Sequence, residues 1–377
     1  MNYRTFRSMP LSAKLLVINQ FGVNVGFYML VPYLAVYLTE DVGLSLALVA
    51  AVLAVRNLSQ QGLFLVGGTA ADRLGPRNVI IAGCALRAVG FGLFAIGDGL
   101  PLLLAGAALS GFAGALFNPA VRAYLSDTSA AHRVANFAVF NAFANAGALV
   151  GPLVGTALLV ADFRLVATVA AALFAALTVA QLCALPRRDV TPTGASILGD
   201  WRTVVTDRPF VIFAVVLSAM YTLCNQLYLL IPVKAGGGVA VAVIFGAATV
   251  ISIVGQVRIT AWCTRHLTAQ QAMTAGLAVM GAAFLFPWPI VAAVVMSLGY
   301  LVAQPFVMDH IGASARPGLS GTYFGLFYAV SGVAAALGST VIGWAASASV
   351  LGAWLLCAAI GLGAAVALRR IRLEVNV

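Results

Sequence analysis

The chain has 377 residues, of which 62% are apolar and only 8% are charged, and its formal net charge is +10. In a soluble globular protein roughly a quarter of the residues are charged. The composition therefore excludes that class and indicates an integral membrane protein. The apolar runs lack strand-like alternation, which favours an all-α membrane protein over a barrel.

Twelve apolar runs follow one another along the chain, and each is close to the ~20 residues that a helix needs to span a bilayer. Very short polar segments separate them. We predict spanning helices at residues 13–38, 44–66, 78–97, 100–125, 133–159, 163–185, 209–235, 239–262, 270–288, 289–309, 319–345 and 350–369.

Nearly all Lys and Arg lie in the two tails or at the ends of even-numbered runs. Arg164 and Lys234 lie at the opposite ends, and Arg56 and Arg87 lie within runs. This asymmetry predicts that both termini are cytoplasmic. It accounts for the positive charge without nucleic acid. The preference for Arg over Lys suggests a GC-rich bacterial gene, and the expected location is the cytoplasmic membrane of a bacterium. The scattered cysteines form no metal-binding spacing, so no metal or cofactor is expected.

The longest polar stretch divides the runs into six and six. We therefore predict an N-terminal half at residues 1–186, a cytoplasmic linker at 187–208 and a C-terminal half at 209–377, the arrangement of two parallel repeats. Within the linker, Ile197–Val205 has the pattern of a short amphipathic helix with Trp201 at the interface. The alternative is a plain tether.

The segment Gly67–Arg77, GGTAADRLGPR, lies between the second and third runs and is predicted to be a loop. A glycine at position 68 lets a neighbouring helix approach closely. Asp72 can face the positive end of a helix, and Arg73 and Arg77 can bridge to carboxylates, with Asp127 as the expected partner of Arg77. Residues 258–266, predicted as the equivalent loop in the second half, lack the aspartate and the glycines. The alternative for Gly67–Arg77 is an ordinary basic loop.

These residues resemble the signature loop of the major facilitator superfamily, Gly-x-x-x-Asp-Arg-x-Gly-x-Arg, with Gly68, Asp72, Arg73, Gly75 and Arg77 in its five places. The resemblance implies the major facilitator fold, with twelve transmembrane helices in two six-helix halves, and a gate at the cytoplasmic side.

A second resemblance lies in the fifth run, where Gly147, Gly151, Pro152 and Gly155 match the Gly-x-x-x-Gly-Pro-x-x-Gly motif of drug:proton antiporters. Small residues permit a tight helix crossing, and a proline bends a helix. The alternative is generic packing. Together the two motifs imply an exporter.

A longer resemblance covers residues 55–77, 86–91, 109–119, 162–166 and 207–211, which are similar to the MdtH-type multidrug exporters among the 12-spanner drug:proton antiporters. It implies the fold and multidrug efflux across the cell membrane, with antibiotic resistance as the associated phenotype.

Arg56 lies in the middle of the second run, where an unpaired charge is costly, and Gln60 shares its helix face. We expect both to line a substrate cavity; the alternative is an arginine held by carbonyl and amide groups. Arg87 is expected to pack helices instead. For the other polar residues within runs the alternative is an interhelical hydrogen bond; the substrate-binding candidates among them are Asn19, Gln20, Asn24, Tyr28, Asn118, Asn141, Tyr221, Asn225, Gln226, Gln304 and Tyr328.

No carboxylate is expected at mid-bilayer, where proton-coupled exporters usually carry one. Coupling could use Asp72, Asp309 or His310, or be absent. With arginines inside and no acid, the cargo is expected to be neutral, zwitterionic or anionic. The chain lacks a Walker loop, a metal cluster and a Ser-His-Asp arrangement, so it is not expected to be an enzyme. We predict a monomeric, proton-coupled exporter of small amphiphilic molecules. The alternatives are an importer or facilitator of a small polar or anionic metabolite, and a non-transporting sensor.

Overall fold

The computed structural model describes residues 9–127, 130–187, 194, 196–227, 229–235 and 238–371, and within them the regular elements are all helical. The first group comprises α2 (Leu11–Glu40), α3 (Leu46–Gln61), α4 (Phe64–Leu74), α5 (Pro76–Ile96), α6 (Leu100–Ser126), α7 (Ala130–Leu159) and α8 (Phe163–Ala184). The helices that follow are α9 (Ile197–Val205), α10 (Arg208–Asn225), α11 (Leu230–Ala235), α12 (Gly238–His266), α13 (Ala269–Ala282), the 3-10 turn η1 (Ala283–Leu285), α14 (Pro289–Ser314), α15 (Ser320–Ala348) and α16 (Val350–Arg370).

The prediction of a helical membrane protein is confirmed. Within the described ranges, ten helices are long and apolar enough to span a bilayer, and the pair α3 and α4, bent by 42°, forms an eleventh span if counted as one. The run predicted at 270–288 is a shorter apolar helix, Ala269–Leu285. Large apolar side chains on the outside, such as Val160 and Trp344, fit contact with lipid.

Three predicted boundaries are wrong. The segment Gly67–Arg77 is not a loop, because α4 continues to Leu74 and the chain turns only at Gly75, whose φ of 86° suits glycine. Residues 258–266 are also helical, as the end of α12. Helix α14 runs to Ser314, so Asp309 lies inside it rather than at its end. In α4 the low helix propensity of glycine is offset by the close packing of Gly67 and Gly68 on neighbouring backbones.

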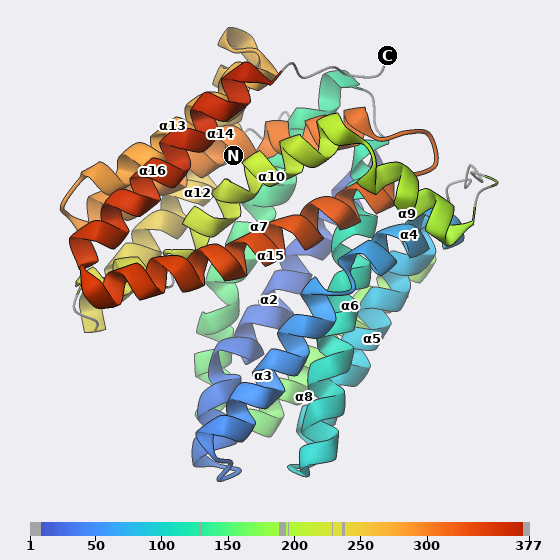
Figure 1. Ribbon diagram of the computed structural model, residues 1–377. Helices are drawn as coiled ribbons and strands as arrows, with labels where there is room; N and C mark the ends of the chain where they lie inside the picture. Colours follow the sequence, from blue (N-terminus) through green and yellow to red (C-terminus); the bar gives the residue numbers. More distant parts are fainter. Residues whose placement is uncertain are drawn as a thin grey trace.

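The helices form two groups, which Figure 1 shows apart over most of their length. Helices α2 and α5 both pack on α8, while α7 packs on α2 and α6 packs on α5. The second group places α14 and α16 on α13, and α15 on α10. Contacts between the groups are made mainly by α15 on α4 and by α12 on α7. Helix α9 lies beside α4 at one end of the bundle, which we call the α9 end (Figure 1).

At the opposite end, Asp98 joins α2 to α8 across the turn between α5 and α6. It accepts a hydrogen bond from the Tyr37 hydroxyl and pairs with Arg164 at 2.5 Å. The Tyr37 hydroxyl and the Arg164 guanidinium together lower the pKa of Asp98 below its usual value. All three residues belong to the first group of helices, so this cluster holds that group together.

Candidate functional site

Asp72 of α4 lies against the N-terminus of α15. Its carboxylate accepts hydrogen bonds from the backbone N–H of Gly321 at 2.6 Å, the N–H of Thr322 at 2.7 Å and the Thr322 hydroxyl at 2.6 Å. The free N–H groups of a helix N-terminus carry partial positive charge. Asp72 therefore faces the positive end of a helix, as the sequence suggested, and that helix belongs to the other group.

Glycines make this contact possible. A Cβ on Gly68 would overlap the carbonyl oxygen of Gly321, and a Cβ on Gly321 would overlap the carbonyl of Gly68. At the next residue of each helix, the Thr69 and Thr322 hydroxyls are 3.3 Å apart. The backbones of α4 and α15 therefore touch directly at the α9 end.

Helix α9 covers the outside of this contact. The predicted amphipathic helix is confirmed at Ile197–Val205. It binds α4 rather than lying free: Asp200 accepts from Arg73 at 2.6 and 3.2 Å, and the Trp201 indole donates to Thr69 at 2.8 Å. Asp200 is buried, so this ion pair is shielded from water on one side.

The expected partnership of Arg77 with Asp127 is not formed in this structure. Arg77 instead donates to the carbonyl oxygens of Leu182 and Leu185 at 2.7 and 2.6 Å. These carbonyls lie at the C-terminal end of α8, where the helix dipole attracts a cation. Arg77 therefore closes the end of α8, within the first group of helices, and Asp127 is exposed.

A second ion pair joins the two groups beside Asp72. Arg133 of α7 pairs with Asp309 of α14 at 2.6 Å, and Ser126 meets Ser320 at 3.0 Å. Residues of α4, α6, α7 and the α14–α15 connection surround a cavity of about 280 Å³, whose polar lining includes Asp72, Asp127, Arg133, Arg316 and Ser320. His310, next to Asp309, instead packs on Phe213 and bonds Ser314.

The glycine–proline motif of α7 faces α2. Cβ atoms on Gly147, Gly151 and Gly155 would each press into the α2 backbone or its side chains, and the carbonyl oxygen of Pro152 accepts from Tyr33 at 2.9 Å. The motif therefore makes a tight crossing, as predicted, and the crossing is between two helices of the same group.

The polar stripe expected on α2 divides between two neighbours. Asn19 accepts a hydrogen bond from Gln181 of α8 at 2.7 Å. Gln20 donates to Asn24, and Asn24 donates to the carbonyl of Ala144 in α7 at 2.7 Å. Asn19 and Asn24 therefore make interhelical hydrogen bonds, the alternative interpretation, whereas the bond of Gln20 to Asn24 lies within α2.

Arg56 is 7% exposed and is held by neutral groups. Its guanidinium donates to Asn57 at 2.8 Å and to Gln60 at 3.1 Å, and it lies 4.7 Å from the ring centroid of Phe27. Tyr28 packs edge-on against Phe27 at 5.0 Å. The structure thus brings together Tyr28, Arg56 and Gln60, three of the predicted site residues.

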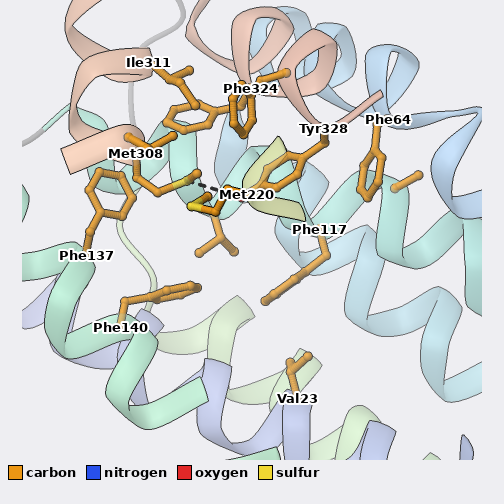
Figure 2. Close-up of a cluster of buried hydrophobic side chains, with 14 of the residues drawn as sticks. Val23, Phe64, Phe117, Phe137, Phe140, Met220, Met308, Ile311, Phe324 and Tyr328 are labelled. Carbon is orange, nitrogen blue, oxygen red and sulfur yellow. Dashed lines mark hydrogen bonds between the residues drawn. The ribbon is translucent and has the colours of Figure 1, made fainter. Parts of the chain in front are cut away.

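Asn118 supports a further arginine. Its carbonyl accepts from Arg122 at 3.0 Å, and the Arg122 guanidinium lies 5.5 Å from the Phe140 ring and 4.9 Å from Tyr328. Figure 2 shows Phe140 and Tyr328 within a cluster of aromatic and methionine side chains, where the Tyr328 hydroxyl points to the sulfur of Met308 at 3.3 Å. This cluster draws on both groups of helices.

The remaining candidates lie between the groups or in the second one. Asn141 of α7 donates a hydrogen bond to Gln304 of α14, and both are buried. Tyr221 lies edge-on to Tyr328 at 6.2 Å. Gln226 is buried and donates to the Thr222 carbonyl at 3.0 Å, whereas Asn225 is exposed at the end of α10.

The structure adds residues that the sequence did not single out as site residues. Thr322 and Arg133 contribute to the contacts between groups, and Phe27 stands beside Arg56. None has a local signal, because a threonine, a basic helix end and an apolar aromatic residue are ordinary in such helices. Only the approach of distant segments reveals them.

Comparison with known proteins agrees with this arrangement. The sequence model of the Major Facilitator Superfamily matches residues 16–339. The chain is 41% identical over 368 residues to an uncharacterised MFS-type transporter of Mycobacterium tuberculosis, covering 91% of this chain and 88% of that protein. It is 29% identical over 342 residues to the multidrug resistance protein MdtH of Proteus mirabilis, covering 87% and 85%.

Two solved structures share the fold. The fucose:proton symporter FucP of E. coli has a TM-score of 0.81 at 13% identity, over 96% of this chain and 98% of that one. The human organic anion transporter MFSD10 has a TM-score of 0.76 at 16% identity, over 96% and 100%. Sequence and fold agree: the chain is a membrane transporter that belongs to the major facilitator superfamily.

Proposed function

We propose that this protein is a secondary transporter that exports small amphiphilic molecules by alternating access. The observation that carries the proposal is the contact of Asp72 with the N-terminus of α15, which joins the two groups of helices at the α9 end. The Asp98 cluster at the opposite end lies within the first group. A contact built from hydrogen bonds and facing glycines can separate as a unit, which is what a gate requires.

The moving units in this proposal are residues 1–186 and 209–377, joined by the linker 187–208. Residues 188–193 and 195 of that linker lie outside the described ranges. The α9 end is taken as cytoplasmic, because Arg73, Arg77, Arg133 and Arg316 gather there. Both termini are then cytoplasmic, in the inner membrane of a bacterium, and one chain suffices as a monomer.

The direction and cargo of the proposal draw on the similarity to MdtH, a multidrug resistance protein. The close crossing of α2 and α7 at Gly147, Gly151 and Gly155 supports the same class, since it rests on the antiporter-like motif. In this proposal the crossing stiffens one half, so that the half moves as a rigid body.

Coupling to protons is assigned to carboxylates at the gate. Asp72 and Asp309 each hold a contact between the two groups of helices. Protonation of either removes the charge that attracts its partner, and so favours opening. His310 is the neighbour of Asp309 but bonds only within α14 and packs on Phe213 in the described structure, which ranks it below the two aspartates.

Everted membrane vesicles test the proposal. Vesicles that contain the protein should accumulate a neutral amphiphilic dye, such as a coumarin, when a proton gradient is imposed, and Asp72→Asn should abolish this uptake. Asp41→Asn, an exposed aspartate at the opposite end, should transport normally. Dye uptake no greater than in vesicles without the protein, across neutral and cationic dyes, would overturn export.

A second candidate is an importer or facilitator of a small polar or anionic metabolite. It is favoured by the buried arginines Arg56 and Arg87 and the half-buried Arg122, which bond no acidic side chain within the part of the chain that the structure describes. Uptake of a radiolabelled organic acid into right-side-out vesicles without a gradient would select this candidate over the exporter.

A further inference from the structure

Two buried arginines from different helices share one aromatic ring. The guanidinium carbons of Arg56 in α3 and Arg87 in α5 lie 4.7 and 5.9 Å from the ring centroid of Phe27 in α2. Their exposed fractions are 7% and 5%. Both guanidinium groups therefore lie beside the same ring.

The protein supplies few acceptors for these groups. A guanidinium has five N–H donors. Arg56 donates hydrogen bonds to Asn57 and Gln60, and its Nε is buried without an acceptor. Arg87 bonds no oxygen among the described residues, and its Nε is likewise buried without an acceptor. Arg87 meets instead the faces of Phe27, Phe117 and Phe174.

Gly114 of α6 brings the pair together. A Cβ at this position would lie 2.9 Å from the Gln60 amide carbon and 3.2 Å from an Arg87 terminal nitrogen. Gln60 accepts a hydrogen bond from Arg56. Gln60 and Arg87 therefore both lie against Gly114, where α6 has no side chain. The two guanidinium groups and the Gln60 amide form one cluster, built from α3 and α5 and packed on α6 at Gly114.

The cluster has an accessible edge. Asn57 is exposed, and Phe27, Tyr28 and Gln60 are partly exposed. Amide side chains are costly in lipid, so the edge with Asn57 and Gln60 faces water rather than acyl chains. A planar apolar body can pack on Phe27 and Tyr28 while its charged group meets the arginines.

We propose that Arg56 and Arg87, with Phe27 between them, form a binding site for the carboxylate or sulfonate of a small organic acid with a planar apolar body. Guanidinium groups bind such anions through paired charge-assisted hydrogen bonds. The site rests on the proposed transport function and specifies its substrate: an amphiphilic anion, whose charge neutralises a region that the protein leaves positive.

Equilibrium dialysis on the purified protein in detergent tests the site without transport, with empty micelles as the blank. The probes are 2-naphthoate and its neutral methyl ester, which share the ring system and differ in charge. The wild-type protein should bind naphthoate at least about tenfold more tightly than the ester, the range expected from one charge-assisted hydrogen bond. Equal binding of the two would overturn the inference without any variant.

Variants then assign the binding to these arginines. Arg56→Gln and Arg87→Gln should each weaken naphthoate binding about tenfold to a hundredfold and leave ester binding unchanged. Arg258→Gln, which removes an exposed arginine of α12, is the matched control and should bind like the wild type. Should a Gln variant fail to fold, the Lys variants keep the charge but lose the planar fork, and should weaken binding to a lesser degree.

The outcomes separate this site from the transport proposal. A protein that moves neutral dye in vesicles but binds naphthoate no better than its ester, or binds it equally after Arg56→Gln and Arg87→Gln, overturns the anion site and leaves export standing. Charge-selective binding that depends on both arginines, in a protein that moves no dye in vesicles, supports the site and overturns export of neutral amphiphiles.

Discussion

Asp72 joins the two groups of helices through its side chain. It is one carboxylate with three donors, all from the first turn of α15. These hydrogen bonds replace bonds to water and form only at short range. All three are therefore lost together once α15 moves away. One residue can therefore hold a large interface closed and release it over a small displacement.

Replacing Asp72 by alanine is expected to open the α9 end. The Gly321 and Thr322 N–H groups lose a charged acceptor, at a cost of about 1.5–3 kcal/mol, which shifts the population of open molecules by about tenfold or more. Spin labels at Asn78 and Arg316, both exposed at this end, should show a longer distance by double electron–electron resonance.

The labels require removal of Cys183, the exposed native cysteine. Asp41→Ala at the opposite end serves as the control and should leave the distance distribution unchanged. If Asp72→Ala gives the wild-type distribution, the carboxylate does not hold this end closed.

At the scale of elements, the contact of α4 with α15 depends on two backbones meeting. Side chains at Gly68 or Gly321 would hold the helices apart, and nothing nearby can yield, because the opposing atoms are backbone. The bend between α3 and α4 serves the same end, since it lets α4 follow α15 while α3 packs on α6.

Gly68→Ala is expected to abolish transport while leaving the protein folded and inserted. The added Cβ would overlap the Gly321 carbonyl, so closure at the α9 end becomes costly, whereas each half keeps its own core. Dye transport and thermal stability in detergent measure the two effects.

Gly246→Ala is the matched control, because a Cβ there would meet no atom within 4 Å; it should transport like the wild type. Normal transport by Gly68→Ala would show that the close approach of α4 and α15 is not part of the cycle.

For the whole molecule, the question is whether the two groups of helices separate during transport. Three polar contacts between them lie at the α9 end: Asp72 with α15, Arg133 with Asp309, and Ser126 with Ser320. Figure 1 shows α15 running away from α3 toward its C-terminal end. This arrangement is what alternating access requires of one of its two closed states.

A disulfide between α4 and α15 should therefore stop transport. The Thr69 and Thr322 hydroxyl oxygens are 3.3 Å apart, so the sulfur atoms of cysteines at these two positions would lie close to each other and a small shift would bring them to bonding distance. The oxidised double variant should move no dye, and reduction should restore activity. Each single cysteine variant should be active in both conditions, and dye transport by the cross-linked form would contradict separation of these helices.

The sequence predicted much of the fold and little of the site's connectivity. Helix positions follow from apolar runs, and the amphipathic helix Ile197–Val205 was predicted to the residue. The helical state of Gly67–Leu74 was missed, because glycine and charge indicate a loop locally, while packing on α6 and α15 decides otherwise. Likewise Asn19 suggested a cavity, but its partner Gln181 comes from α8, which no local pattern reveals.

What the sequence determined by itself is the class of the protein: membrane helices, their approximate limits, and the family motifs at Asp72 and Gly151, all of which depend on residues near one another in the chain. Tertiary structure alone decided the partners. Asp72 meets α15, Arg77 meets the carbonyls at the end of α8 rather than Asp127, and Arg56 and Arg87 share Phe27. Whether a segment spans the membrane depends on its own run of apolar residues. Hydrogen bonds and charge pairs depend instead on which distant segments are brought within about 3 Å of each other.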